Sequence, residues 1–284
     1  MTDAPAAGRV GVLVPVAFDW YFAGILHGVA DAVYEHRLRV MLSPTRHEHA
    51  REVALINELR ETTDGAVLIL PEESSEELLA VLSDDYPLVV VDPLVPLDAR
   101  IPSVAAANAS GAEQAVQHLL ELGHRRIAAI TGPPGWVATE ERRRAYRGAL
   151  AAAGIPFEPS LELEADFDFD PGAQAAAVLL ELDRPPTAIF AFSDMIAIGA
   201  MRTARSLGIR IPDELSIVGF DDSAFAPVVH PALTTVRQPL AEMGATAVDL
   251  LVRLMRRESV DALHLEPFTR LVVRETTTTP RLAG

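Results

Sequence analysis

Apolar and polar positions along the chain follow two recurring patterns. Short runs rich in Val, Ile and Leu predict strands, and their unbroken hydrophobicity is typical of parallel strands buried on both faces. Longer segments with apolar residues three and four positions apart predict amphipathic helices. The predicted strands are 10–14, 39–42, 66–70, 88–91, 127–131, 161–165, 188–192 and 216–220. The predicted helices are 22–34, 48–62, 76–82, 111–122, 139–153, 172–182, 195–207 and 240–256.

Strands and helices alternate along nearly the whole chain. This order predicts right-handed β-α-β units and therefore an α/β fold with doubly wound parallel sheets. Gly123, Gly154 and Gly208 each follow a predicted helix, as expected where a helix ends in a left-handed residue. With 284 residues the chain exceeds the usual size of one core, so we expect two lobes. The closing run 276–279 is expected to be a loose tail.

Composition narrows the class of protein. Hydrophobic residues make up 49% and charged residues 23%, which is typical of a soluble globular protein. No apolar run reaches the roughly 18 residues that a membrane span needs, and the first residues do not resemble a secretory signal, so we expect a cytoplasmic location. The chain has no cysteine, which excludes disulfides and thiolate chemistry. Its formal net charge of −16 repels phosphate backbones, so the chain itself is not expected to bind nucleic acid.

Candidate binding residues follow the predicted strands. In open α/β sheets, ligands bind beyond the carboxyl ends of the strands. The residues at such positions are Asp19, Trp20, Tyr21, Trp136, Arg142, Phe167, Ser193, Asp194, Asp221 and Asp222. Aromatic faces combined with carboxylates and a guanidinium group suit a polyol such as a sugar. The sequence therefore predicts a small-molecule site at the strand ends.

Each of these residues also has a structural interpretation. Asp194 is equally well placed to cap the helix predicted at 195–207, and Asp222 is more typical of a turn acid than of a ligand contact. Either Trp is compatible with the core. Of the run Arg142–Arg144, only Arg142 is favoured for the site, because Glu140 precedes Arg144 by four residues and surface ion pairs are expected there.

Metal and catalytic motifs are weak or missing. The run Asp166–Asp170 imitates the start of a calcium loop, but Pro171 occupies the position that needs Gly and Ala177 the position that needs a carboxylate. His47 and His49 have the wrong spacing for zinc on one helical face. The chain contains no G-x-S-x-G, no G-x-G-x-x-G and no lysine. We therefore expect no metal, no cofactor and no enzymatic activity.

Six segments carry a family resemblance. They are "HLLELGHRRIAAITGP" (118–133), "RRRAYRGALAAAGI" (142–155), "PTAIFAFSDMIAIGAM" (186–201), "IPDELSIVGFDDS" (211–223), "PALTTVRQPLAEMG" (231–244) and "LVVRETT" (271–277). In this order and at this spacing they resemble the effector-binding core of the lactose/galactose-repressor (LacI/GalR) family of transcription regulators. The resemblance covers about residues 8–278.

The resemblance implies two lobes of periplasmic-binding-protein-like type, joined by three crossovers with a ligand cleft between them. On that basis the N-terminal lobe is expected to comprise 8–122 and 239–266, and the C-terminal lobe 123–236 and 268–278. Residues 279–284 are then the tail.

The resemblance also assigns effector contacts. The family's arginine falls on Arg142, its strand-end acid on Asp221, its aromatic on Phe167 and its helix-start acid on Asp194. Ser193 replaces the usual asparagine, and Asp19, Trp20 and Tyr21 stand in the first-loop motif that usually reads N-P-F-F. Ser110 takes a position that often bears a polar contact, with Asn108 nearby. Trp136 completes the candidate set. The aromatics and acids favour a neutral or cationic polyhydroxylated ligand.

The function implied by the resemblance is that of a ligand-sensing and dimerisation core. Such a core forms a homodimer and binds a small effector, most often a sugar, to modulate operator binding by an N-terminal helix-turn-helix domain. Few residues precede the first predicted strand, so that domain is expected to be absent from this chain. The alternative is a solute-binding receptor for a sugar transporter, which shares the fold. A dimer favours the regulator and a monomer favours the receptor.

Overall fold

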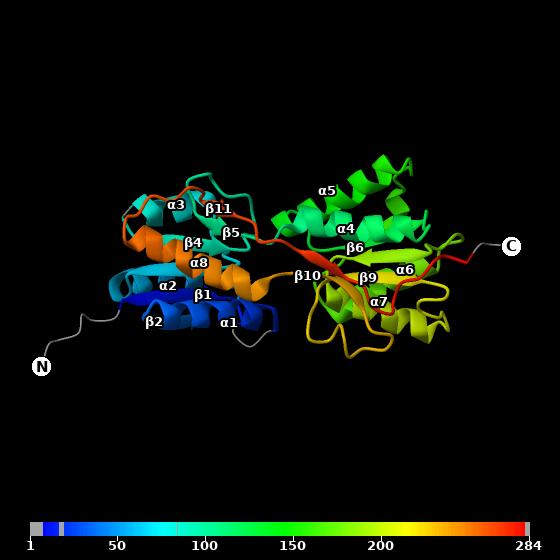
Figure 1. Cartoon of the computed structure of the whole chain (residues 1–284), viewed down its shortest axis with the longest axis horizontal. Coiled ribbons are helices and arrows are strands. Elements are labelled where there is room, and N and C mark those ends of the chain that lie inside the picture. The colour runs from blue at the N-terminus through cyan, green and yellow to red at the C-terminus, as the bar shows by residue number, and fades with distance from the viewer. Residues whose placement is uncertain (1–7, 17–19, 84, 282–284) are drawn as a thin grey trace, which may run out of the picture. The chain divides into compact units, whose positions relative to one another are not determined.

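The computed structural model describes residues 8–16, 20–83 and 85–281, which form two compact units (Figure 1). Unit 1 comprises Met1–Ala106 and Pro239–Pro267, and unit 2 comprises Ala107–Gln238 and Phe268–Gly284. Each unit is therefore built from segments that lie far apart in the sequence.

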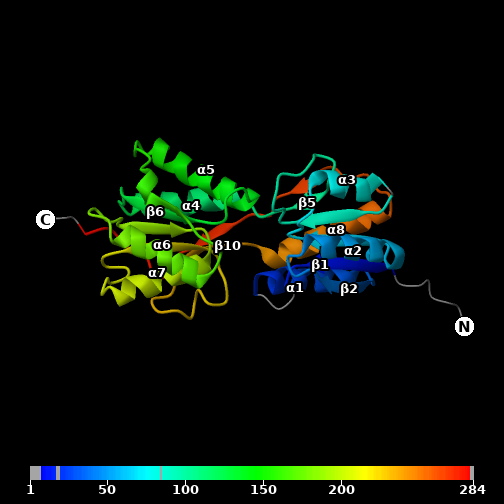
Figure 2. The same ribbon diagram turned by 180° about the vertical axis from the view of Figure 1, so that it is seen from behind.

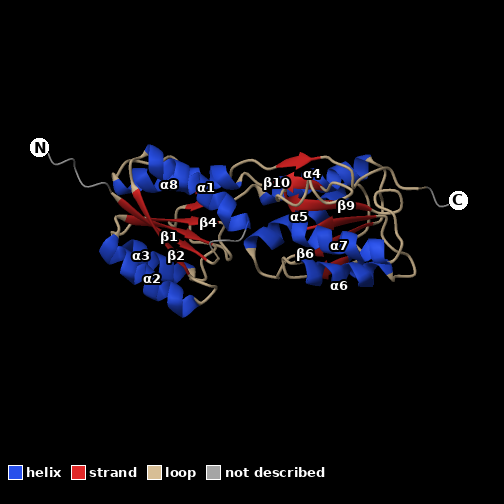
Figure 3. Ribbon diagram, turned by 90° about the horizontal axis from the view of Figure 1, so that it is seen from below, coloured by secondary structure: helices blue, strands red, loops and turns tan. Residues whose placement is uncertain are grey.

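Unit 1 is a parallel sheet between two layers of helices. Its strands, in the spatial order β11-β5-β4-β3-β1-β2, all pair in parallel. Helices α1 and α8 cover one face, and α2 and α3 cover the other (Figure 3). Its elements are β1 Arg9–Val14, α1 Trp20–Glu35, β2 Arg39–Pro44, α2 His49–Thr62, β3 Gly65–Ile69, α3 Ser75–Ser83, β4 Leu88–Val91, β5 Ser103–Val104, α8 Leu240–Met255 and β11 His264–Leu265.

Unit 2 repeats this architecture with one antiparallel edge. The strand order is β12-β10-β9-β8-β6-β7, and only the β10–β12 pair is antiparallel. Helices α4 and α5 lie on one side of the sheet and α6 and α7 on the other (Figure 2). Its elements are α4 Asn108–Glu121, β6 Ile127–Thr131, α5 Val137–Ala152, a 3₁₀ turn Pro159–Leu161, β7 Glu162–Glu164, α6 Phe169–Leu180, β8 Ala188–Ala191, α7 Asp194–Ser206, β9 Ser216–Asp221, β10 Thr234–Arg237 and β12 Arg270–Val272.

The central strands are fully buried because helices cover both faces, which explains their unbroken hydrophobicity. On the α4 and α5 side of unit 2, the core holds Tyr146, Phe190, Phe192 and Phe220, each fully or almost fully buried. Burial of one such aromatic stabilises the fold by roughly 1.5–3 kcal/mol. The Tyr146 hydroxyl donates to the Ile127 carbonyl at 2.8 Å, so its polar atom is satisfied.

The predicted α/β fold class is confirmed, and every strand and helix predicted by residue range coincides with an observed element. The strands that the sequence reading did not identify are short: β5, β10 and β11 contain between two and four residues each. Such runs are too brief for periodicity to reveal. The last strand, β12, is found at Arg270–Val272, so it begins one residue before the segment 271–277 and ends within it.

The predicted boundary between the lobes at residue 122 was misplaced. Helix α4 belongs to unit 2, because its apolar face, with Ala112, Val116 and Leu119, joins the core beneath β8, β9 and β10. A Cβ atom on Gly111 would lie 2.8 Å from Val236 and 3.0 Å from Phe220, so this helix sits directly on the sheet of unit 2. The two later boundaries, after Gln238 and after Pro267, lie within two residues of the positions expected.

The threonine run 276–279 is not a loose tail. Thr276 is fully buried, and its hydroxyl donates to the Ile217 carbonyl at 2.7 Å. The Thr278 carbonyl lies 2.9 Å from Nε2 of His124. These bonds attach the run to the edge of β9. Of the expected tail at 279–284, residues 282–284 lie outside the described residues.

Among the described helices, none is both long and apolar enough to cross a membrane.

Candidate ligand-binding site

The candidate site in unit 2 is centred on the end of β9. Asp221 is the last residue of that strand and has a φ of 122°, and Asp222 follows with a φ of 56°. Two successive non-glycine residues with positive φ are strained, at a cost of order 1–3 kcal/mol each, and such strain concentrates at functional sites. The backbone at this turn is therefore held by its surroundings.

Asp222 supplies part of that support. Its side chain is almost fully buried and accepts hydrogen bonds from Arg237 on β10 and from Arg274, the latter at 2.5 Å. The expectation that Asp222 stabilises the turn agrees with this geometry. Two guanidinium groups therefore fix the carboxylate of Asp222. The neighbouring Asp221 binds neither of them and has other partners.

Asp221 lies in a nearly dry setting and feels the charge of Arg142. It is 6% exposed, and its Oδ1 accepts a hydrogen bond from Nε2 of Gln238 at 2.7 Å. Burial raises the pKa of Asp221 well above its ordinary value, and the carboxyl of Asp194 adds to that rise. The charge of Arg142 and the amide of Gln238 oppose it. The carboxyl group is thus expensive to ionise unless a polar ligand contributes further hydrogen bonds.

Arg142 is 4% exposed and comes from the second turn of α5. Its Nε and Nη2 both donate to Oδ1 of Asn108, at 3.0 and 2.7 Å, and Nη1 donates to the Phe192 carbonyl at 2.5 Å. The guanidinium carbon lies 3.7 Å from the centre of the Phe220 ring, a cation–π contact. The guanidinium is therefore held in a fixed orientation over the ring of Phe220.

The sequence allows Asp194 to cap the helix that is α7, but the structure gives that role to Ser193. Ser193 is the N-cap of α7, and its hydroxyl accepts from the Ile196 N–H at 3.2 Å. Asp194 is fully buried; its two oxygens accept from the Thr235 hydroxyl at 2.5 Å and the Ser223 N–H at 2.7 Å. Both oxygens are thus engaged inside the protein. The helix-cap interpretation of Asp194 was wrong, and its geometry is that of a residue that positions the Asp221 turn.

An aromatic pair lies at the ends of β6 and β7. The rings of Trp136 and Phe167 are 5.7 Å apart at an interplanar angle of 57°, and both residues are half-buried. A Cβ atom on Gly132 would lie 2.1 Å from the Phe167 ring, so glycine is required for the ring to rest on this turn. Apolar faces of this kind suit the C–H faces of a sugar.

The corresponding strand ends of unit 1 carry a second polar pair. The Tyr21 hydroxyl donates to Oδ2 of Asp92 at 2.6 Å, and Trp20 lies edge-on to Tyr21 with ring centroids 5.8 Å apart. Asp92 follows β4 with a φ of 54°. The sequence reading overlooked Asp92, although an acid directly after a buried strand was the signal used elsewhere. Asp19 lies outside the described residues.

Ser110 and Asn108 also differ from expectation. Ser110 is exposed, and its hydroxyl accepts from the Gln114 side chain at 3.4 Å. The residue that meets Arg142 is the buried Asn108. Gln238 was likewise missed, because it follows a short strand that periodicity did not reveal.

Groups suited to a metal ion are missing from the described part of the chain. Asp168 caps α6 by accepting from the Phe169 N–H, and Asp170 pairs with Arg202. His47 and His49 pair separately with Glu72 and Glu77. In both regions these polar side chains are thus engaged with one another or with the backbone.

The site thus combines a buried carboxyl, an oriented guanidinium, two amide side chains and a pair of aromatic rings. Carboxyl, guanidinium and amide groups donate to and accept from vicinal hydroxyls, while the rings cover an apolar face. The described residues of the site bring together no nucleophile and base.

Comparison with known proteins agrees with this description. Residues 116–277 match the family model of a periplasmic binding protein-like domain. The chain is 34% identical to the ribose operon repressor of Halalkalibacterium halodurans, over 95% of this chain and 80% of that protein.

Two solved structures are also similar to this chain in sequence and fold. A complex of the transcriptional regulator CelR with cellobiose is 34% identical, covers 94% of this chain and 84% of its own, and has a TM-score of 0.85. A LacI family regulator from Enterococcus faecium with bound ribose is 25% identical, covers 96% and 100%, and has a TM-score of 0.85. The chain described here therefore belongs to the LacI/GalR family of transcriptional regulators and is its effector-binding core.

Proposed function

We propose that the site at the strand ends of unit 2 binds a carbohydrate effector. The observation that carries the proposal is that Arg142 and Asp221 are both buried, the first as a fixed guanidinium and the second as a carboxyl that gains from added hydrogen bonds. A sugar hydroxyl can accept from the arginine and donate to the carboxyl at once. Two solved relatives, bound to cellobiose and to ribose, support this ligand class.

The remaining contacts follow from the same geometry. Trp136 and Phe167 offer ring faces to the apolar side of the sugar. Trp20 and Tyr21 of unit 1, together with Asp19, are by contrast proposed from the family resemblance alone. Ser193 and Ser110 stay candidates from the family resemblance. Asp194 is proposed to act by positioning.

The biological role follows from the relatives. They are transcriptional repressors and regulators, so we infer that effector binding modulates DNA binding by a helix-turn-helix domain and that the chain catalyses no reaction. The net charge of −16 makes direct binding of DNA by this core unfavourable. A cytoplasmic location is the corresponding expectation.

A homodimer is the assembly that we propose. In unit 2, Phe225 and Val228 are 41% and 74% exposed in the loop after β9, and the Phe225 ring contacts Phe169 at the start of α6. Val178 on α6 is 54% exposed. Large apolar side chains left in solvent favour a protein partner. Sedimentation at micromolar concentration tests this, and a monomer would support the transporter-receptor alternative instead.

The test of ligand binding is a thermal-shift screen of mono- and disaccharides, including ribose and cellobiose. A ligand at a hundred times its Kd adds about 2.7 kcal/mol of apparent stability. The Asp221→Asn variant should lose most of that shift. An Asp213→Asn variant removes the same charge from an exposed position and should keep it. If no sugar stabilises the wild type, or if Asp221→Asn responds as the wild type does, the proposed site is wrong.

A further inference from the structure

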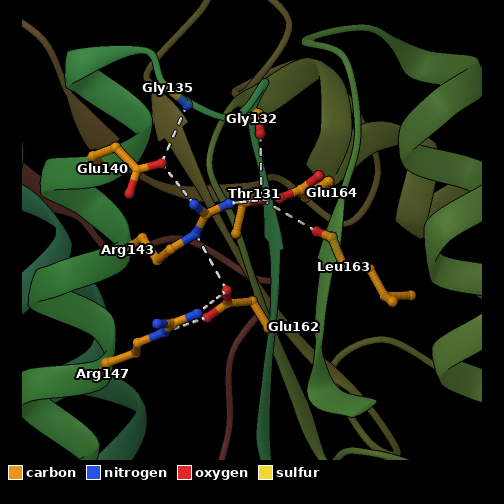
Figure 4. Close-up of polar contacts among 9 residues, drawn as sticks. All are labelled: Thr131, Gly132, Gly135, Glu140, Arg143, Arg147, Glu162, Leu163 and Glu164. Carbon is orange, nitrogen blue, oxygen red and sulfur yellow. Dashed lines mark hydrogen bonds and ion pairs between the residues drawn. The ribbon is translucent and has the colours of Figure 1, made fainter. Parts of the chain in front are cut away.

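Two adjacent arginines of α5 point in different directions. Arg142 reaches Asn108 and the Phe192 carbonyl, as described above. Arg143 turns instead toward the edge of the sheet formed by β6 and β7 (Figure 4). Its side chain is only 13% exposed, so it is a packed residue rather than a solvated one. The expectation of simple surface ion pairs in this run therefore does not describe Arg143.

Arg143 contacts three elements at once (Figure 4). Its Nη1 donates to Oε1 of Glu140 at 2.6 Å, within α5. Its Nη2 donates to the Thr131 hydroxyl at the end of β6, at 3.3 Å, and to Oε1 of Glu164 at the end of β7, at 3.1 Å. Its Nε forms an ion pair with Oε1 of Glu162 at 3.2 Å. The guanidinium therefore ties one helix to the ends of two strands.

The segments that follow these strand ends carry the aromatic pair. Thr131 leads into the Gly132–Gly135 turn and then Trp136, while Glu164 comes three residues before Phe167. Glu140 extends the network to that turn, because its Oε1 also accepts from the Gly135 N–H at 3.3 Å. The loops that carry Trp136 and Phe167 are therefore both connected by hydrogen bonds to the guanidinium of Arg143.

The charges make Arg143 hard to replace within this network. Three carboxylates surround it, from Glu140, Glu162 and Glu164, and the other cation present is Arg147. Arg147 binds Glu162 at 2.6 Å and lies 46% exposed. Without Arg143, Glu140 and Glu164 would face each other uncompensated, and like charges at this edge would push β7 away from α5.

We propose that Arg143 is a positioning residue that fixes the Trp136 and Phe167 rings against each other for ligand binding; its consequence for affinity rests on the proposed sugar site. The guanidinium holds the β6 and β7 loops at a fixed separation, and the ring pair takes its geometry from them. Arg142 binds the ligand and Arg143 orients the aromatic surface beside it.

The test uses the full chain with Trp20→Phe, so that Trp136 is the remaining tryptophan. Arg143→Gln is compared with Arg144→Gln, which removes the same charge from an exposed position of the same helix. In Arg143→Gln, acrylamide quenching of Trp136 should rise, and amide hydrogen exchange over 162–168 should be about tenfold faster, the effect expected when charge-assisted hydrogen bonds are lost. Arg144→Gln should change neither, and Arg143→Lys should recover part of the protection. Thermal unfolding identifies any global loss of structure.

Equal quenching and exchange in the two Gln variants would overturn the proposal, whether or not any sugar binds. Affinity is measured in the wild-type background, without Trp20→Phe. For a sugar that binds the wild type, Arg143→Gln should weaken affinity about tenfold and Arg144→Gln should leave it unchanged. Altered exchange with unchanged affinity would also overturn the positioning role. A wild type that binds no sugar contradicts the proposed function instead, so the two failures are distinguishable.

Discussion

The two units bury acidic side chains in contrasting ways. In unit 2, Asp194 and Asp221 receive hydrogen bonds from Thr235, Ser223 and Gln238, and Arg142 adds a positive charge. In unit 1, Glu52 and Glu73 are 1% and 2% exposed. Of the side-chain oxygens there, Oε1 of Glu52, both oxygens of Glu73 and the Thr45 hydroxyl have no hydrogen-bond partner among the described residues.

The surroundings of the glutamate pair are mostly acidic. Oε2 of Glu52 accepts from the Glu72 N–H at 3.1 Å, which brings Glu52 beside the Glu72–Glu73 segment. Burial raises the pKa of Glu52 to about 7, with Glu72 adding to the rise and His49 opposing it. Burial also raises the pKa of Glu73 to about 8, and Glu52, Glu77 and Glu72 add to it. His47 and His49 are engaged with Glu72 and Glu77.

The comparison shows how hydrogen-bond donors affect a buried carboxyl group. Burial raises the pKa in both units, to about 7 for Asp194 and Glu52 and to about 8 for Glu73. In unit 2 hydrogen-bond donors fix the orientation of the carboxyl groups, whereas in the described part of unit 1 comparable donors are few. The raised pKa values couple stability to pH in both units.

The largest expected effect comes from removing the cation of unit 2. Arg142→Ala leaves Oδ1 of Asn108 and the Phe192 carbonyl without their charged donor, and losing these three hydrogen bonds costs about 3 kcal/mol or more. Unfolding of the variant should therefore begin at a markedly lower temperature than that of the wild type. Arg144→Ala is the control, since its side chain is exposed, and equal destabilisation by both would contradict this description of Arg142.

A somewhat smaller effect is expected at Asp194. Asp194→Ala deprives the Thr235 hydroxyl and the Ser223 N–H of their acceptor, a loss of about 2 kcal/mol in the free energy of unfolding. Because Asp194 supports the Asp221 turn, sugar affinity should fall as well. Denaturant unfolding measures the first effect and calorimetric titration the second. Wild-type stability in this variant would show that the buried bonds contribute little.

Unit 1 should respond to pH. In the unfolded chain, Glu52 and Glu73 ionise near 4.5, while in the folded unit they keep their protons to about 7 and 8. The folded state thus binds more protons between these values, so stability falls as the pH rises from about 4.5 to about 8.

Glu73→Gln removes one of these groups. Because ionisation of Glu73 destabilises the folded unit, the variant should be more stable than the wild type at pH 8 and nearly as stable as the wild type at pH 5. Melting temperatures across this range measure the effect. The exposed Glu76→Gln should retain the wild-type pH dependence. A Glu73→Gln variant whose stability follows wild type at every pH would refute the account of unit 1.

The smallest effect is expected at Asp222. Asp222→Asn keeps the side-chain shape and weakens the bonds from Arg237 and Arg274, with a cost of about 1 kcal/mol. Raising the salt concentration should reduce the difference from wild type only slightly, because the carboxylate is buried. If high salt abolished the stability difference between the variant and the wild type, the ion pairs of Asp222 would be exposed rather than buried.

The sequence predicted the fold and named part of the candidate site for identifiable reasons. Periodicity located the long elements, and the strand-end rule selected Arg142, Asp221 and Phe167 without knowledge of their contacts. It could not select Gln238 or foresee the contact of Asn108 with Arg142, because these arise only through the packing of α4 and the position of β10 in the sheet.

The glutamate pair was equally hidden from sequence reasoning. Glu52 lies in an amphipathic helix where glutamate normally faces solvent, and Glu73 lies in a polar loop twenty-one positions later. Their burial depends on how α2 packs beside the end of β3. The role of Arg143 was hidden for the same reason, since its partners come from two strands that lie apart from α5 in the sequence.

The most direct test of the account is calorimetric titration of one sugar identified in the screen into wild type, Asp221→Asn and Glu73→Gln. Removing a charged hydrogen-bond partner should weaken affinity about tenfold or more in Asp221→Asn. Glu73→Gln should bind as the wild type does at the same pH, because its carboxyl belongs to unit 1's proton-linked pair. Loss of affinity in Glu73→Gln together with full affinity in Asp221→Asn would contradict the account.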